Sequence, residues 1–116
     1  MDFDCRSTDM GVCIIALKGR TTLQDLKEME ARLKSLVINQ RAVIIDLSHL
    51  DFLFSMCLRT LIICAQSVQL RNGRLAILSP NENILAVLKA SGVMKLLPVC
   101  SDIAQAEAAV LTNSST

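Results

Sequence analysis

The segment from residue 43 to residue 61, VIIDLSHLDFLFSMCLRTL, constrains the fold of this chain more than any other. It begins with a β-branched apolar run, residues 43–45, that ends at Asp46, as a buried strand of a parallel sheet does. After a polar step at residues 48–49 the sequence is apolar again, and a helix follows from Ser55. Ser is a favoured N-cap, so we expect the Ser55 hydroxyl to accept from the first free backbone N–H groups. A strand that leads into a helix N-terminus is a natural place for an anion or for a regulated side chain.

Apolar periodicity over the rest of the chain predicts strands that alternate with helices. We expect strands near residues 1–5, 11–17, 42–47, 75–78 and 96–99, and helices near residues 22–37, 55–70, 81–91 and 103–111. In the second of these helices the inward positions are Leu58, Leu61, Ile62, Ala65 and Val68. Thr22 with Asp25, or Thr21 with Gln24, gives the first helix a capping-type start.

This order predicts one α/β domain, residues 1–111, with a flexible C-terminal tail at residues 112–116. The sheet should be mixed and have four to five strands, with about four helices packed mainly on one face. Gly19 to Thr21 should end the second strand, and Asn72–Gly73 should end a helix in the left-handed turn that Gly accepts at low cost. Pro98 lacks a backbone donor and predicts an edge position for the last strand.

Composition excludes several classes of function. A net charge of +1 gives no electrostatic reason to expect nucleic acid or anionic lipid, and three Phe without Trp or Tyr nearly exclude base-stacking platforms. No apolar run approaches the roughly 18 residues of a membrane span, so direct membrane insertion is not expected and a cytoplasmic location is the default. The five cysteines contain no CxxC pair and are expected to be small core residues, with neither disulfides nor a zinc site. Cys57 falls in the first turn of a helix, where the dipole can lower a thiol pKa.

No catalytic centre is predicted. The one histidine, His49, stands near Asp46 and Asp51, which could suggest an acid–base or metal cluster. We favour a polar strand-to-helix loop in which Asp46 caps backbone donors and His49 is solvated. The four glycines are scattered singly and form no phosphate-binding loop, so no metal, cofactor or enzymatic activity is expected.

The outward stripe of the second helix is a candidate interface. Met56, Arg59, Ile63 and Gln66 follow helical spacing opposite the inward face, and two of the four are apolar. Exposed apolar residues beside an Arg suit a protein interface, and a flexible Met adapts to a partner surface.

Residues 43–61 resemble the signature of STAS domains, the family of bacterial anti-sigma factor antagonists. There a strand ending in Asp-Leu leads through an apolar segment to Asp-Ser-Ser/Thr-Gly-Leu at the start of a helix. Asp46–Leu47 match the end of the strand, Leu50, Phe52 and Leu53 match the apolar segment, and Ser55 matches the first Ser. The resemblance extends over roughly residues 11–110 and includes Leu88-Lys89-Ala90-Ser91-Gly92, which matches the family's Leu-x-x-Ser-Gly.

The resemblance implies a regulator that binds an anti-sigma factor or a related serine kinase, in transcription or stress control. In the family the second Ser or Thr is phosphorylated by the partner kinase, and that position is Met56 here, between Ser55 and a Cys57 in place of Gly. Phe54 replaces the family Asp, so the phosphoacceptor motif is degenerate. We therefore expect no switch at this position, with abundance control, or more remotely Cys57 oxidation, in its place.

The family's partner surface also includes the loop that holds Thr21 and Thr22 here, and a homodimer remains open. Two alternatives stay alongside this interpretation. One is a STAS subunit of a stressosome-like or transporter-associated complex. The other is a small-ligand or nucleotide-binding domain that uses the N-terminus of the Ser55 helix.

Overall fold

A computed structural model describes residues 1–111, so the expected tail at residues 112–116 lies outside the described residues. One sheet has the strand order β1-β2-β3-β4-β5, in which β1 is antiparallel to β2 and the remaining neighbours are parallel. The strands are β1 (Asp2–Ser7), β2 (Cys13–Arg20), β3 (Ala42–Phe52), β4 (Arg74–Leu78) and β5 (Val99–Cys100). The helices are α1 (Leu26–Val37), α2 (Ser55–Leu70), α3 (Glu82–Ala90) and α4 (Ile103–Leu111), with 3₁₀ turns η1 (Leu23–Asp25) and η2 (Val93–Lys95). The predicted mixed sheet with helices interleaved is confirmed.

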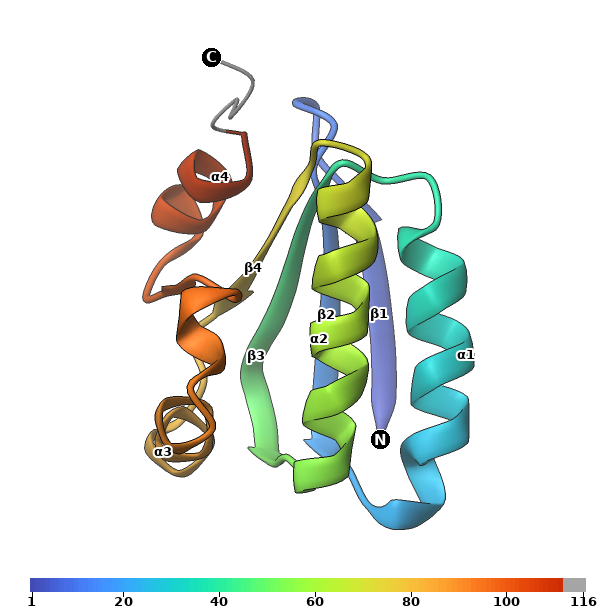
Figure 1. Cartoon of the computed structure of the whole chain (residues 1–116), viewed down its shortest axis with the longest axis vertical. Helices are drawn as coiled ribbons and strands as arrows, with labels where there is room; N and C mark the ends of the chain where they lie inside the picture. The colour runs from blue at the N-terminus through green and yellow to red at the C-terminus, as the bar shows by residue number, and fades with distance from the viewer. Residues whose placement is uncertain (112–116) are drawn as a thin grey trace.

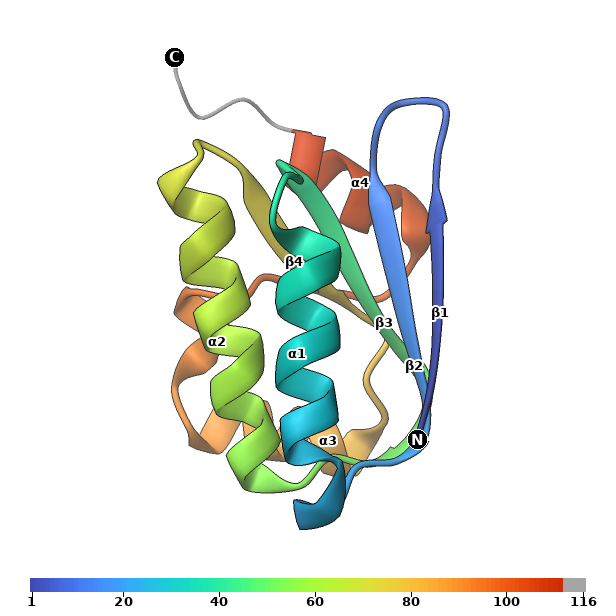
Figure 2. The same cartoon turned by 90° about the vertical axis from the view of Figure 1, so that its right-hand side faces the viewer.

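The sheet is covered on both faces, but unequally. α1 and α2 lie side by side on one face, and α4 lies on the opposite face (Figures 1 and 2). Side chains that alternate along the strands divide between two cores, because successive residues of a strand point to opposite faces. The first core takes Ile15, Ile45, Ile77 and α3 residues Ile84 and Leu88, and the second takes Ile14, Ile44, Ala76 and α4 residues Ala106 and Val110. Most of the helical mass therefore lies on one face, as expected.

β3 is longer than the sequence predicted. The expected loop at Ser48 and His49 is an irregularity within the strand, where β3 advances three residues from Asp46 to His49 while β2 advances two. The Asp46 carboxylate accepts from the Ser48 backbone N–H at 2.9 Å, so Asp46 does satisfy a backbone donor, as expected. Beyond this bulge β3 continues to Phe52 because β2 also continues alongside it, through Gly19 to Arg20. β2 therefore ends at Arg20, within the segment 19–21 that was expected to end it, but three residues later than the predicted strand 11–17.

Two other boundaries also differ from expectation. The residue in the left-handed conformation after α2 is Asn72, with φ 62°, and not Gly73. Gly73 is required for a close backbone contact instead. A Cβ on Gly73 would clash with the backbone of Arg41, so only glycine allows this close approach. The last strand is reduced to β5, since the Leu96 and Leu97 backbone N–H groups donate to the Val93 carbonyl in the turn that follows η2. β5 does lie at the sheet edge, as Pro98 predicted.

The parallel strands bring several connecting segments together at one end of the sheet. β2, β3, β4 and β5 all point the same way, so the segments that follow them all start at the end of the sheet where the carboxyl ends of these strands lie. Two of these segments, after β2 and after β3, form the site described next, and the other two border a separate hollow. Among residues 1–111, no helix is both long and apolar enough to span a bilayer.

Candidate partner-binding site

The loops that follow β2 and β3 are tied together at the N-terminal end of α2. The Thr21 backbone N–H donates to the Phe52 carbonyl at 2.9 Å, and the Thr21 hydroxyl accepts from the Phe54 N–H at 2.7 Å. The Cys57 thiol approaches the Thr22 carbonyl at 4.0 Å from the first turn of the helix. Thr21 is fully buried, so its side chain holds the two loops in register and does not form part of the surface. Thr22 is exposed beside it.

Thr22 begins η1 and is paired with Asp25. The Asp25 carboxylate accepts from the Thr22 backbone N–H at 2.8 Å and from the Thr22 hydroxyl at 2.9 Å. Of the two capping pairs predicted for the start of the first helix, the structure therefore contains Thr22 with Asp25. The hydrogen bonds from Thr22, the hydroxyl first, lower the pKa of the Asp25 carboxyl, so this loop carries a negative charge at neutral pH.

Ser55 is not the N-cap that the sequence predicted. Phe54 takes that position, with φ −63° and ψ 131°, and no side chain caps the helix. Ser55 is the first residue of α2 and is exposed. The cause is non-local, because the hydrogen bond from Phe54 N–H to Thr21 fixes the extended backbone of Phe54 one residue earlier. The Ser55 hydroxyl is thus accessible at the helix N-terminus.

Cys57 is buried, and its thiol is not activated. Its side chain is 0% exposed, and burial raises the pKa of the thiol. The Thr21 side chain acts in the opposite direction, and the charges of Asp25 and Glu30 raise the pKa further. The expected lowering by the helix dipole is therefore wrong, because the cost of burying a thiolate is larger here. Cys57 packs in the first core and serves the fold.

The outward face of α2 presents the predicted stripe. Met56 and Ile63 are 53% and 37% exposed, and Arg59 and Gln66 on the same face of the helix are also exposed. The structure adds Leu70, which is 87% exposed, and sequence reasoning missed it. Its signal was available, since residues 56, 63 and 70 are spaced by seven and lie on one side of a helix. We call Met56, Arg59, Ile63, Gln66 and Leu70 the α2 stripe.

The stripe also borders a small cavity on the side of α1. A cavity of about 240 Å³ between α1 and α2 is lined by Ile63 from α2 and by Val37 and Ile38, where α1 ends. Ile38 is itself 61% exposed. The apolar surface therefore widens from a single row on α2 toward the end of α1.

The polar residues of β3 are spread along the strand. Ser48 and His49 are exposed, and Asp51 follows on the same strand. Within residues 1–111, no group of three or more His, Cys, Asp and Glu side chains is placed to hold a metal ion.

Comparison with known proteins identifies the family of this chain. The model of the STAS domain matches residues 7–106. A curated relative is BtrV of Bordetella bronchiseptica, assigned as an anti-sigma factor antagonist, which is 28% identical over 88% of this chain and 89% of its own. Among solved structures, an anti-sigma factor antagonist from Mycobacterium paratuberculosis superposes with a TM-score of 0.84 at 20% identity, covering 94% of this chain and 92% of the other. A protein from Thermotoga maritima with the same assignment has a TM-score of 0.83 at 18% identity, covering 90% of each chain.

Proposed function

Because the chain belongs to the STAS domain family, we propose that it is an anti-sigma factor antagonist that acts by binding a protein partner. The partner is an anti-sigma factor or a related serine kinase, and its capture would release the sigma factor. The observation that carries the proposal is the α2 stripe, which leaves Met56, Ile63 and Leu70 unusually exposed for large apolar side chains. The relative from Bordetella bronchiseptica supports the same class of partner.

The geometry supports a surface that combines the α2 stripe with the exposed Thr22. The bonds of Thr21 to Phe52 and Phe54 hold the loop after β2 against the start of α2. A partner that covers the first turn of α2 would therefore also meet Thr22 and the Asp25 carboxylate bonded to it. Arg59 in the first turns of α2 and Asp25 in the adjacent loop give the surface charges of both signs, which fix the orientation of a partner.

The first prediction tests this surface. Met56→Glu together with Ile63→Glu places two charges in the stripe and should abolish capture of the partner in a pull-down followed by mass spectrometry. A desolvated interface core does not accept unpaired charges, whereas exposed sites of the free protein tolerate them within about 0.5 kcal/mol. The free energy of unfolding should therefore stay nearly the same.

A matched control adds the same charges elsewhere. Ala86 on α3 and Ala104 on α4 are exposed and lie outside α2. Ala86→Glu with Ala104→Glu should leave capture intact. Undiminished capture by the Met56/Ile63 variant would place the interface on another face.

The second prediction concerns regulation of the same surface. Met56 stands at the acceptor position of the family signature and has no hydroxyl, so we propose that binding is not switched there. Ser55 is accessible, but one residue along a helix turns a side chain by about 100° around the axis. A kinase active site that fits position 56 would face Met56, and the Ser55 oxygen would point away from the phosphate that is transferred.

The experiment uses ATP, the captured kinase and intact-mass analysis. The unaltered chain should gain no phosphate. Met56→Ser should gain one phosphate and lose its partner, since a phosphate adds nearly two negative charges at the interface. Met56→Ala is the control and should gain none. Stoichiometric phosphate on Ser55 of the unaltered chain, with loss of binding, would instead show an ordinary switch displaced by one residue.

A further inference from the structure

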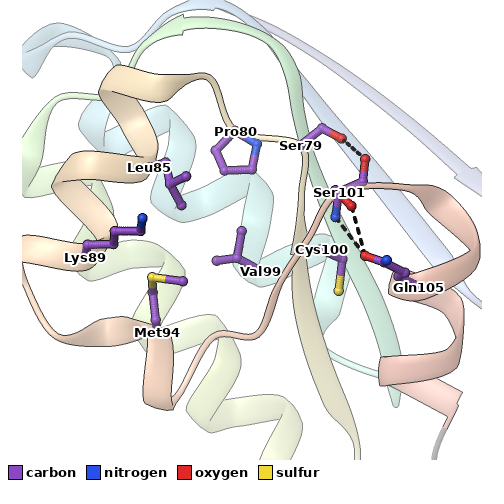
Figure 3. A pocket seen from close by; sticks show the side chains of 9 residues that line it. All are labelled: Ser79, Pro80, Leu85, Lys89, Met94, Val99, Cys100, Ser101 and Gln105. Atoms are coloured by element: carbon purple, nitrogen blue, oxygen red, sulfur yellow. Dashed lines mark hydrogen bonds between the residues drawn. The ribbon is translucent and has the colours of Figure 1, made fainter.

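A hollow of about 460 Å³ lies away from the α2 stripe, among α3, η2, β5 and the start of α4 (Figure 3). Its apolar walls come from Pro80, Leu85, Met94 and Val99. Small-molecule sites in proteins are concave, mostly apolar and of about 300–1,000 Å³. The size and lining of this hollow fall in that class.

The hollow lies where helices leave the sheet in opposite directions. After β4 the chain enters α3, whose Ile84 and Leu88 pack in the first core. After β5 it enters α4, whose Ala106 and Val110 pack in the second core on the other face. β4 and β5 are parallel neighbours, so their connections separate at a crevice just beyond their carboxyl ends. Ligands of open α/β sheets bind in crevices of this kind.

Lys89 supplies the charge of the hollow. It is the one charged residue among those that line it, and its Nζ points between Leu85 and Met94 toward Val99 (Figure 3). The ion pairs found in the described part of the chain are Lys18–Asp4 and Arg32–Glu28, so Lys89 has no carboxylate partner there. An unpaired ammonium at the mouth of an apolar hollow attracts an anion that can also bury an apolar body.

The opposite wall of the hollow is held rigid by a short chain of hydrogen bonds. The Ser79 hydroxyl donates to the Ser101 carbonyl at 2.9 Å, which ties the segment after β4 to the segment after β5. The Ser101 backbone N–H and hydroxyl both donate to the Gln105 side-chain oxygen, at 3.1 and 3.0 Å (Figure 3). This wall is therefore pre-formed, which reduces the entropy that a ligand must overcome on binding.

We propose that this hollow binds a small organic monocarboxylate with an apolar body. The carboxylate pairs with Lys89, and the apolar body lies against Leu85, Met94 and Val99. One cation selects for one negative charge, and the apolar lining selects for a hydrocarbon or aromatic body over a polar one. The site is separate from the α2 stripe, so a test of this proposal is independent of a test of the protein partner proposed above.

Titration with octanoate, followed by amide shifts in two-dimensional NMR, tests this assignment. Saturable shifts are expected at residues 79, 85, 89, 94 and 99–101, with none along α2. Octan-1-ol, which has the same chain length without the charge, should bind more weakly. Acetate, which has the charge without the chain, should bind at least tenfold more weakly. For octan-1-ol the expected loss is about threefold to fivefold, since Lys89 is exposed and an exposed ion pair contributes up to about 1 kcal/mol.

Two lysine variants complete the test. Lys89→Met keeps the aliphatic stem and removes the charge, so it should weaken octanoate binding about threefold to fivefold while leaving octanol binding unchanged. Lys95→Met is the matched control, since Lys95 is exposed on η2 and does not line the hollow. It should leave octanoate binding unchanged. The assignment is wrong if octanoate gives no saturable shifts at these residues, if octanol binds as tightly, or if the two variants behave alike.

Discussion

Two buried threonines differ in what their hydroxyls contact. Thr21 is fully buried, and its oxygen accepts from the Phe54 N–H at 2.7 Å. Thr60 is 1% exposed on α2, and its oxygen has no hydrogen-bond partner among the described residues. A buried hydroxyl without a partner costs about 1–3 kcal/mol, because on folding it loses its hydrogen bonds to water and forms none within the protein. The same side chain therefore stabilises the fold at one position and weakens it at the other.

Replacement of each threonine by the isosteric valine should separate these effects. Thr60→Val removes the unpaired hydroxyl and should raise the free energy of unfolding by about 1 kcal/mol. Thr21→Val leaves the Phe54 N–H without its acceptor and should lower it by about 1–3 kcal/mol. Chemical denaturation with urea measures both. Equal losses from the two variants would mean that the Thr60 hydroxyl does have a partner in solution.

At the scale of elements, one side chain joins the ends of two helices. Arg71 follows α2, and its guanidinium donates to the Gln40 carbonyl at 3.2 and 3.0 Å and to the Val37 carbonyl at the end of α1. It also donates to the Ser67 hydroxyl at 3.1 Å. Carbonyls at a helix C-terminus lack partners within the helix and carry partial negative charge, so a cation there satisfies both needs.

Arg71→Met should therefore lower the free energy of unfolding by about 2 kcal/mol, since it removes charge-assisted hydrogen bonds from a half-buried site. Arg59→Met is the control, because Arg59 is exposed on the same helix. It should change stability by less than about 0.5 kcal/mol. Urea denaturation of the two variants compares them directly, and equal effects would contradict the capping role of Arg71.

Sequence reasoning identified elements well where the signal is local. The predicted helix near residues 81–91 is present as α3, where the Asn81 side chain accepts from the Ile84 N–H at 2.8 Å, and the predicted inward residues Leu58 and Ala65 of α2 are buried. It failed where a distant segment decides the outcome. The bond to Thr21, 33 residues earlier in the chain, makes Phe54 the N-cap in place of Ser55. Such contacts leave no periodic pattern in the sequence.

At the scale of the whole molecule, the candidate sites differ in how far the sequence could predict them. The α2 stripe lies on one helix, so its spacing predicted four of its members. The hollow was not predicted, because Pro80, Lys89 and Val99 come from different elements and meet only in the folded sheet. The apolar residues 43–45 did predict a buried strand of a parallel sheet, and α4 covers the face of the sheet opposite α1 and α2.

The two cores should unfold as one unit. Ala65 in the first core and Ala106 in the second are 1% and 0% exposed, on helices that cover opposite faces of the sheet. Ala65→Asp and Ala106→Asp each bury a charge without a partner, which costs several kcal/mol, a large part of the stability of a domain of this size. Each variant should unfold, or should melt in a single transition at a much lower temperature.

Ala104→Asp provides the matched control, since Ala104 is exposed on the same helix as Ala106. Its melting temperature should stay close to that of the unaltered chain, because a charge on an exposed site changes stability by less than about 0.5 kcal/mol. Thermal melts followed by circular dichroism measure all three variants. If Ala106→Asp instead gave two separate transitions, α4 would be detaching from a sheet that stays folded, and the second core would be a separate cooperative unit.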